Sequence, residues 1–228
     1  MNIILIILVA ILILIIPVTI YLYRWIPFQE RKRMMINLGF SEIRFLESYV
    51  STKIRRLIQT PVKKKNIYRF SSEGAQFLVI FSNLPSLFNK EEIYSIIVIS
   101  EKLQLPRFTL TSKLNITNRL DSIMNSTMDQ LAKLEAGAKN LHKIEIQAYP
   151  ELNKRFVLLG EDEKLVIRFF SKERSKKIFQ IKSSIELSAN SDLFTIKTDV
   201  SQHNEISEEN KMRRTINIAR RIYRVLSN

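Results

Sequence analysis

The chain has 228 residues, of which 46% are hydrophobic and 25% are charged, a balance that is typical of a globular protein and excludes a disordered one. It contains no cysteine, which excludes a disulfide scaffold, a thiolate nucleophile and a thiolate metal site. Thirty-six Lys and Arg residues against 22 Asp and Glu residues give a net charge of +14. We therefore expect an acidic partner, with lipid headgroups or an acidic protein ranked above nucleic acid, unless the lysines are simply solvated.

The first predicted element is a transmembrane helix, because the run from Ile3 to Tyr23 contains no charged residue. At about 1.5 Å per residue such a helix spans about 31 Å, the thickness of the hydrocarbon core of a bilayer. A secretory signal peptide would need a cation before the apolar run and a small-residue cleavage site after it, and neither is present. A helix in the core of a soluble domain seldom runs this long without a polar position. Residues 1–27 are therefore predicted to be a membrane anchor.

Aromatic and basic side chains follow the predicted span directly. Tyr and Trp prefer the level of the lipid headgroups, and Lys and Arg stay on the cytoplasmic side of a membrane. We therefore expect a single-pass protein of the cell (inner) membrane, with its N-terminus outside and the rest of the chain in the cytoplasm. The predicted membrane-interface residues are Tyr21, Tyr23, Arg24, Trp25, Arg31, Lys32 and Arg33.

Residues 28–65 are predicted to form a juxtamembrane basic collar and a helix. Apolar residues recur at steps of three and four between Ile43 and Ile58, which indicates a helix over residues 34–59. Ser41 is the candidate N-cap, and Thr60-Pro61 closes the helix. The basic run at residues 63–65 is interpreted as a solvated loop.

Residues 66–207 are predicted to form an α+β domain, built on an antiparallel sheet with packing helices. Ser71-Ser72-Glu73-Gly74 and Asn190-Ser191-Asp192 are turn sequences between segments rich in β-branched and aromatic residues, which indicates two hairpins. Helical periodicity returns twice between the strands. The predicted strands are 66–70, 75–82, 93–100, 107–110, 143–148, 156–159, 185–187 and 194–198, and the predicted helices are 118–137 and 162–178.

The last predicted element is a basic amphipathic helix over Glu208–Leu226, within residues 208–228. Met212, Ile216, Ala219, Tyr223 and Leu226 lie at steps of three and four and form one apolar stripe. This stripe either packs on the domain core or contacts a membrane or a partner helix, and the pattern leaves both open. The candidate basic surface comprises Lys211, Arg213, Arg214, Arg220, Arg221 and Arg224.

No catalytic, cofactor-binding or metal-binding residue is predicted. The two histidines, His142 and His203, lie in different segments and lack a ligand spacing. Three acidic residues follow Gly160 at the start of a predicted helix, where helix capping explains them better than cation binding. We expect an interaction or scaffold protein with no cofactor. The alternatives are a membrane-tethered enzyme with a cleft between sheet and helices, and a nucleic-acid tether.

Several short motifs occur in a fixed order: Gly39-Phe40, Tyr68-Arg69, Leu105-Pro106-Arg107-Phe108 and Pro150-Glu151-Leu152-Asn153-Lys154-Arg155-Phe156, followed by Gly160-Glu161-Asp162. Behind an apolar N-terminus with an Arg-rich collar, this order resembles a family of uncharacterised bacterial single-pass membrane proteins. The resemblance implies an N-terminal anchor and a soluble α+β domain, and it brings no established activity. Family members often carry an acidic residue at the end of the second strand, where this chain has Phe81-Ser82-Asn83.

Overall fold

The structure is a computed structural model that describes residues 29–43, 46–58, 67–82, 93–113, 140–198 and 207–228. Contacts between residues divide the chain into two units, Met1–Glu42 and Ile43–Asn228. The predicted transmembrane helix, the basic run at residues 63–65 and the predicted helix over 118–137 lie outside the described residues. The described residues have an α+β fold with a large antiparallel sheet, which confirms that part of the predicted fold class.

A helix over residues 29–37 ends at Gly39, which has a φ of +83°. The N–H of Phe40 donates to the carbonyl oxygen of Met35 over 2.9 Å, and this i to i−5 bond closes a Schellman motif. Glycine is favoured there because the left-handed backbone crowds a Cβ atom. The prediction that Gly39 precedes a helix start, with Ser41 as its N-cap, is therefore wrong. Gly39 ends a helix, and Ser41 begins a strand.

Three elements share the range 34–59 that was predicted as a single helix: the end of the helix over residues 29–37 and the two elements that follow it. Strand β1 covers Ser41–Ile43, and helix α2 covers Ser48–Ile58. The apolar period that suggested one helix is satisfied by both elements, because Ile43 of β1 and Val50 of α2 pack against the same core cluster. Because both elements bury their apolar residues in the same cluster, the spacing of these residues looked like one face of a single helix.

Nine strands form the sheet in the described part of the chain, in the order β1-β2-β3-β4-β9-β8-β5-β7-β6. From β2 to β6 every neighbouring pair is antiparallel, as predicted for the sheet. Besides β1, the strands are β2 Ile67–Ser72, β3 Ala75–Ser82, β4 Ile93–Ile99, β5 Leu105–Ser112, β6 His142–Ile144, β7 Phe156–Gly160, β8 Ile185–Ser191 and β9 Leu193–Thr198.

Both predicted hairpins are confirmed, and each has a tight turn. Strands β2 and β3 are joined by the two-residue loop Glu73-Gly74, in which both residues have positive φ, +58° and +77°. Two positive φ values in a row define a type I′ turn, whose twist matches that of the flanking strands. Strands β8 and β9 are joined around Ser191, which has a φ of +59°.

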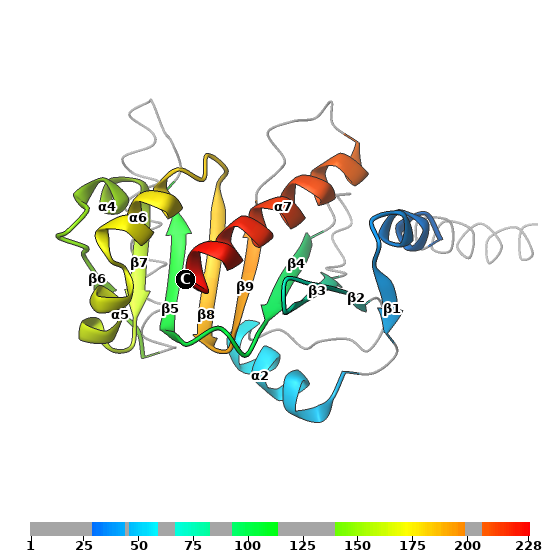
Figure 1. The fold of residues 1–228 in the computed structure, drawn as a ribbon, viewed down its shortest axis with the longest axis horizontal. Coiled ribbons are helices and arrows are strands. Elements are labelled where there is room, and N and C mark those ends of the chain that lie inside the picture. Colours follow the sequence, from blue (N-terminus) through cyan, green and yellow to red (C-terminus); the bar gives the residue numbers. More distant parts are fainter. Residues whose placement is uncertain (1–28, 44–45, 59–66, 83–92, 114–139, 199–206) are drawn as a thin grey trace, which may run out of the picture. The chain divides into compact units, whose positions relative to one another are not determined.

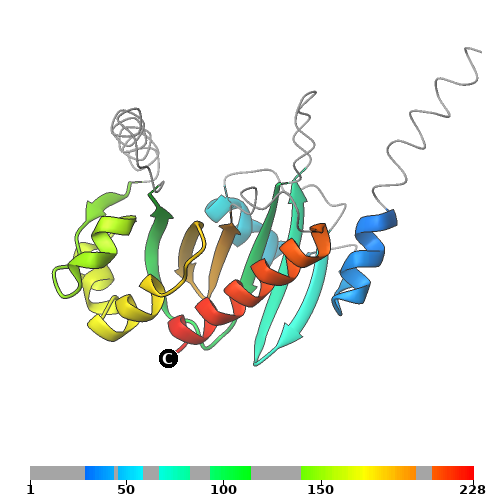
Figure 2. The same ribbon diagram turned by 90° about the horizontal axis from the view of Figure 1, so that it is seen from above.

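Helices cover both faces of the sheet (Figures 1 and 2). On one face α2 buries Ile54 in a cluster with Leu78 of β3. On the other face lies α7, which covers Glu208–Leu226 as predicted, and its Tyr223 ring packs on Phe77 with centroids 6.2 Å apart. Because Phe77 and Leu78 are neighbours in one strand, their side chains point to opposite faces.

Three short helices, α4 Pro150–Arg155, α5 Glu163–Phe169 and α6 Lys172–Phe179, lie on the same face as α7 (Figure 2). The predicted helix over 162–178 is therefore interrupted. Phe170 leaves the helical conformation and buries its ring against Phe108, with centroids 5.0 Å apart. Ser171 then caps α6 by accepting the N–H of Arg174. A single straight helix could not place Phe170 against the sheet and also begin α6 at Ser171.

Strand β6 stops at Ile144, so the strand predicted over 143–148 is too long. Beyond it, the N–H of Ile146 donates to Asn153 Oδ1 over 3.0 Å, and Asn153 Nδ2 donates to the Ile146 carbonyl over 3.2 Å. The side-chain amide thus supplies the two hydrogen bonds that a neighbouring strand would supply. Asn153 belongs to α4, a helix that was not among the predicted helices.

Candidate functional site: the basic outer face of the helices

The predicted membrane interface is described only in part. Arg31, Lys32 and Arg33 lie on the helix over residues 29–37, where Lys32 Nζ pairs with Glu42 Oε2 at 2.8 Å. Arg33 is exposed and Arg31 is half-buried. Among the described residues, no helix combines the length and the apolar composition needed to cross a bilayer. The remaining predicted interface residues, Tyr21, Tyr23, Arg24 and Trp25, lie outside the described residues.

The apolar stripe of α7 packs on the sheet. Its residues are at most 5% exposed, so the interpretation of this stripe as core is correct and the interpretation as a membrane-contacting face is wrong. The reason is geometric, because an amphipathic helix lying on an antiparallel sheet buries its apolar side against the strands. The buried residues of the helix are Met212, Thr215, Ile216, Ala219, Ile222, Tyr223 and Leu226.

The opposite side of α7 is polar and cationic. We call this face the outer stripe, and all of its residues are exposed. At about 1.5 Å of rise per residue the stripe extends over about 21 Å. It contains neither an apolar nor an acidic side chain. The outer stripe comprises Asn210, Arg213, Arg214, Asn217, Arg221 and Arg224.

A hollow of about 360 Å³ lies along the N-terminal half of this stripe and is lined by Asn210, Arg213, Arg214 and Asn217. Amide and guanidinium groups are hydrogen-bond donors, and guanidinium groups bind carboxylates and phosphates in pairs of parallel bonds. This part of α7 is therefore suited to an anionic group.

Two cations of the predicted basic surface are not on the outer stripe. Lys211 is half-buried and pairs with Glu208 at 2.9 Å. The Arg220 guanidinium lies over the ring of Phe70, 4.9 Å from its centroid, and its buried Nε has no hydrogen-bond partner within the described part of the chain. Both side chains are engaged by the fold itself.

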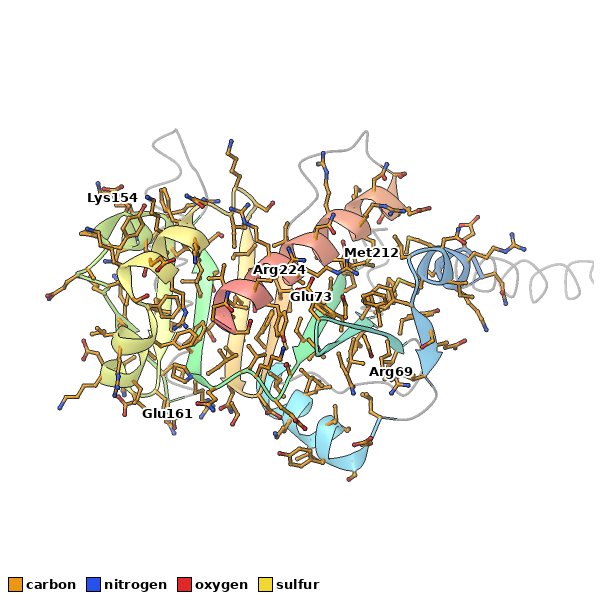
Figure 3. The ribbon with its side chains drawn as sticks, viewed as in Figure 1. Arg69, Glu73, Lys154, Glu161, Met212 and Arg224 are labelled. Carbon is orange, nitrogen blue, oxygen red and sulfur yellow. The ribbon has the colours of Figure 1, made fainter. Side chains whose placement is uncertain are left out.

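Within the outer stripe, two arginines are neutralised by carboxylates of the same unit. Arg213 pairs with Glu209 at 3.0 Å, and Arg224 forms a two-pronged ion pair with Glu73 of the β2–β3 turn (Figure 3). The hydrogen bonds to Arg224 hold the pKa of Glu73 below its usual value, and Glu73 in turn raises the pKa of Arg224.

Arg214 and Arg221 are the other two arginines of the stripe. Both are exposed, and neither forms an ion pair with another described residue. Their guanidinium groups therefore keep all of their charge and donor capacity for a partner. They lie seven residues apart, two turns of the helix, on the same side.

Beneath the stripe, hydroxyl groups fix α7 to the strands. Tyr223 Oη lies 3.2 Å from Ser100 Oγ and donates to the Glu73 carbonyl over 3.2 Å. Further along, Thr215 Oγ1 lies 3.1 Å from Tyr94 Oη. Burial raises the pKa of Tyr94, so its hydroxyl stays protonated and able to donate. These contacts fix the rotation of α7, and hence the direction of the outer stripe.

A second basic region lies at α4 and α6, where a hollow of about 510 Å³ is lined by Glu151, Lys154, Arg155, Phe179 and Lys182. We call it the Arg155 hollow, and one of its lining residues, Lys154, is labelled in Figure 3. No sequence pattern predicted it, because its residues come from two helices and the segment after α6. Burial lowers the pKa of Arg155, because the loss of surrounding water makes the charged form of the guanidinium less favourable.

Residues considered for metal or catalytic chemistry are dispersed. His142 is exposed on β6, and His203 lies outside the described residues. Asp162 caps α5 by accepting the N–H of Leu165 over 3.0 Å, which confirms the capping interpretation of the acids after Gly160. In the described ranges, no group of three or more His, Cys, Asp or Glu residues could hold a metal ion.

Comparison with known proteins gives no assignment: no protein-family model, no curated protein and no solved structure matches this chain.

Proposed function

We propose that this chain is a non-enzymatic interaction module of the cell membrane. Residues 1–27 anchor it with the N-terminus outside, and the α+β domain lies in the cytoplasm. The outer stripe of α7 binds an anionic partner, with lipid headgroups preferred over an acidic protein. The resemblance to single-pass membrane proteins and the charge-free run from Ile3 to Tyr23 support the anchor.

One observation carries the binding part of the proposal: α7 buries its apolar side, and from Asn210 to Arg224 its exposed residues are only Asn and Arg. The exposed Glu208 lies in the first turn and pairs with Lys211. A helix that inserted into a bilayer would need its apolar side free, and here that side is in the core. The contact with a partner is therefore made by charge and hydrogen bonds alone. Such a contact is screened by salt, since the Debye length falls from about 8 Å at physiological ionic strength to about 3 Å at 1 M.

A bilayer is the favoured partner because the anchor would hold the domain beside one. Near an anionic leaflet each exposed Lys or Arg contributes about 1 kcal/mol of attraction. Arg214 and Arg221, which have no carboxylate partner in the described part of the chain, would together contribute about 2 kcal/mol. An acidic protein would satisfy the same charges, and the experiment below separates the two.

The orientation is tested with a reporter enzyme fused after Asn228. A fluorescent reporter that folds only in the cytoplasm should be active there, and alkaline phosphatase, which needs the periplasm, should be inactive in a bacterial host. Alkaline phosphatase activity would overturn the orientation. Recovery of the full chain in the soluble fraction would overturn the anchor.

The binding role of the outer stripe is tested on the chain that lacks residues 1–27. This variant should float with vesicles that contain anionic lipid, stay unbound with neutral vesicles, and be released at about 1 M salt. The double variant Arg214→Glu/Arg221→Glu should lose flotation. A matched control, Lys143→Glu/Lys164→Glu, makes the same change in net charge at exposed positions on β6 and α5 and should float normally.

Two results would contradict the lipid assignment. If the control loses flotation as strongly as the α7 variant, the attraction depends on net charge and not on the outer stripe. If the truncated chain does not float on anionic vesicles, lipid is not the partner. In that case crosslinking of the full-length protein in native membranes, with and without the α7 substitutions, tests for an acidic protein.

A further inference from the structure

The Arg155 hollow combines one half-buried cation with two exposed ones. The guanidinium of Arg155 lies over two aromatic rings, 5.1 Å from the centroid of Phe156 and 5.7 Å from that of Phe179. Lys154 and Lys182 are exposed and reach the same space. The hollow is thus basic, with an aromatic wall formed by Phe179.

Only part of the donor capacity of Arg155 is used by the fold. Nη1 donates to the Phe179 carbonyl over 2.6 Å, and Nη2 donates to the Ser183 carbonyl over 3.4 Å. A guanidinium has five N–H donors, so three have no partner among the described residues. Both partners are neutral carbonyls, and no described carboxylate compensates the charge of this half-buried group.

The electrostatic balance of the hollow remains positive after the opposing charges are counted. Glu151 lines the hollow and pairs with Lys154 at 2.8 Å, which leaves two net positive charges among the lining residues. The C-termini of α4 and α6 also lie here, and each contributes at most about half a negative charge. About one positive charge or more therefore remains, which favours a multiply charged anion.

We propose that the Arg155 hollow binds a phosphate monoester. A phosphate monoester carries about −1.5 to −2 charges at neutral pH and offers three strong acceptor oxygens. These match the N–H donors of Arg155 that the fold leaves open and the ammonium group of Lys182, while Lys154 is shared with Glu151. Phe179 provides a ring against which an apolar or planar group attached to the phosphate packs. The site lies on α4 and α6, apart from the outer stripe of α7, and the proposal does not depend on the membrane role of that stripe.

Phenyl phosphate is a suitable probe, and the full chain in a non-ionic detergent is the protein to titrate. Isothermal titration should show one site, with phenyl phosphate binding several-fold more tightly than inorganic phosphate because of the ring contact. A short-chain phosphatidic acid carries the same phosphate on a lipid. The tighter of the two organic ligands identifies the source of the phosphate. Because the outer stripe is also cationic, binding supports the Arg155 hollow only if it is lost in the Lys182→Glu variant and kept in Arg214→Glu/Arg221→Glu.

Lys182→Glu is the informative variant, because Lys182 makes no hydrogen bond that the fold needs in the described part of the chain. It should weaken phenyl phosphate binding about tenfold or more. Lys177→Glu is the matched control: Lys177 lies on α6, pairs with Glu173 and does not line the hollow. This control should bind within about twofold of the unmodified chain.

The proposal would be overturned if the unmodified chain bound none of the three phosphates. It would also fail if Lys182→Glu bound phenyl phosphate normally, or if Lys177→Glu lost binding to the same extent. Arg155→Lys provides a second measurement, since it keeps the charge but not the forked donors. It should weaken phenyl phosphate and inorganic phosphate to a similar extent, because both ligands lose the same forked contact, and the circular dichroism spectrum checks that the fold is retained. Unchanged binding of both ligands by a folded Arg155→Lys chain would contradict the site.

Discussion

The inner and outer sides of α7 belong to one helix but differ in environment, because the inner side is buried on the sheet and the outer side is exposed. The inner side packs on β3, β4 and β9 and is held by hydroxyl contacts at Tyr223 and Thr215. The outer side is exposed, and Arg214 and Arg221 have no ion-pair partner in the described part of the chain. Substitutions on the two sides should therefore separate folding from binding. The number of cations on α7 does not show which of them can bind a partner, because some of them already pair with carboxylates or rings of the same fold.

The largest effect is expected from the inner side, at Ile222. This side chain is fully buried against the sheet, so Ile222→Ala removes apolar contacts and leaves a cavity. The free energy of unfolding should fall by about 2–5 kcal/mol. Urea denaturation of the full chain in detergent measures it. Asn217→Ala, on the exposed side of the same helix, is the control and should change stability by less than about 0.5 kcal/mol.

A smaller effect is expected from the polar end of a buried side chain. Tyr223→Phe keeps the ring against Phe77 but removes the hydroxyl that contacts Ser100 and the Glu73 carbonyl. The loss should be about 1 kcal/mol. A double-mutant cycle with Ser100→Ala tests whether the two hydroxyls act together, and strictly additive losses would contradict a direct contact.

The next effect depends on pH and concerns the ion pair between Glu73 and Arg224, which lies where the inner and outer sides of α7 meet. The pKa of Glu73 is lower in the folded chain than its ordinary value of 4.5, because of its hydrogen bonds to Arg224. The pair therefore adds stability above the ordinary pKa, and this stability is lost as the pH falls through the lowered pKa. The difference in urea midpoint between the unmodified chain and Glu73→Gln should shrink from about pH 6 to pH 3. An unchanged difference would show that the pair contributes nothing through ionisation.

The smallest effect on stability is expected on the outer side. Arg214→Glu/Arg221→Glu should leave the free energy of unfolding within about 0.5 kcal/mol, because both side chains are exposed and unpaired within the described residues. The same variant should abolish flotation on anionic vesicles. A large loss of stability would mean that these arginines serve the fold, and the division between the two sides of α7 would not hold.

Elements with strong local signals were predicted well. The start of α7 at Glu208 was predicted correctly, and in the structure Ser207 caps it by accepting the N–H of Asn210. The β2–β3 hairpin follows from Gly74, which takes a positive φ without a steric penalty. In both cases the residues that define the element are close together in sequence.

The errors arise where distant contacts decide the local structure. Phe170 breaks the predicted helix because its ring packs on Phe108, about 60 residues earlier. The shortening of β6 depends on the side chain of Asn153, and the Arg155 hollow depends on the packing of α4 beside α6. The Gly39 error is different, because a glycine between two apolar periods fits a helix end as well as a helix start.

The pairing of β4 with β9 has a consequence for biosynthesis. Ile96 lies opposite Ile196, so about 100 residues must be translated after the first strand of this pair before its neighbour exists. The apolar face of the sheet is covered only when Leu226, the last residue of α7, has left the ribosome, about 130 residues after Ile96. At 5–20 residues per second this interval lasts roughly 6–26 s. During that time the nascent chain exposes an unpaired strand edge and an apolar surface. Both features favour aggregation, and chaperones bind segments of this kind.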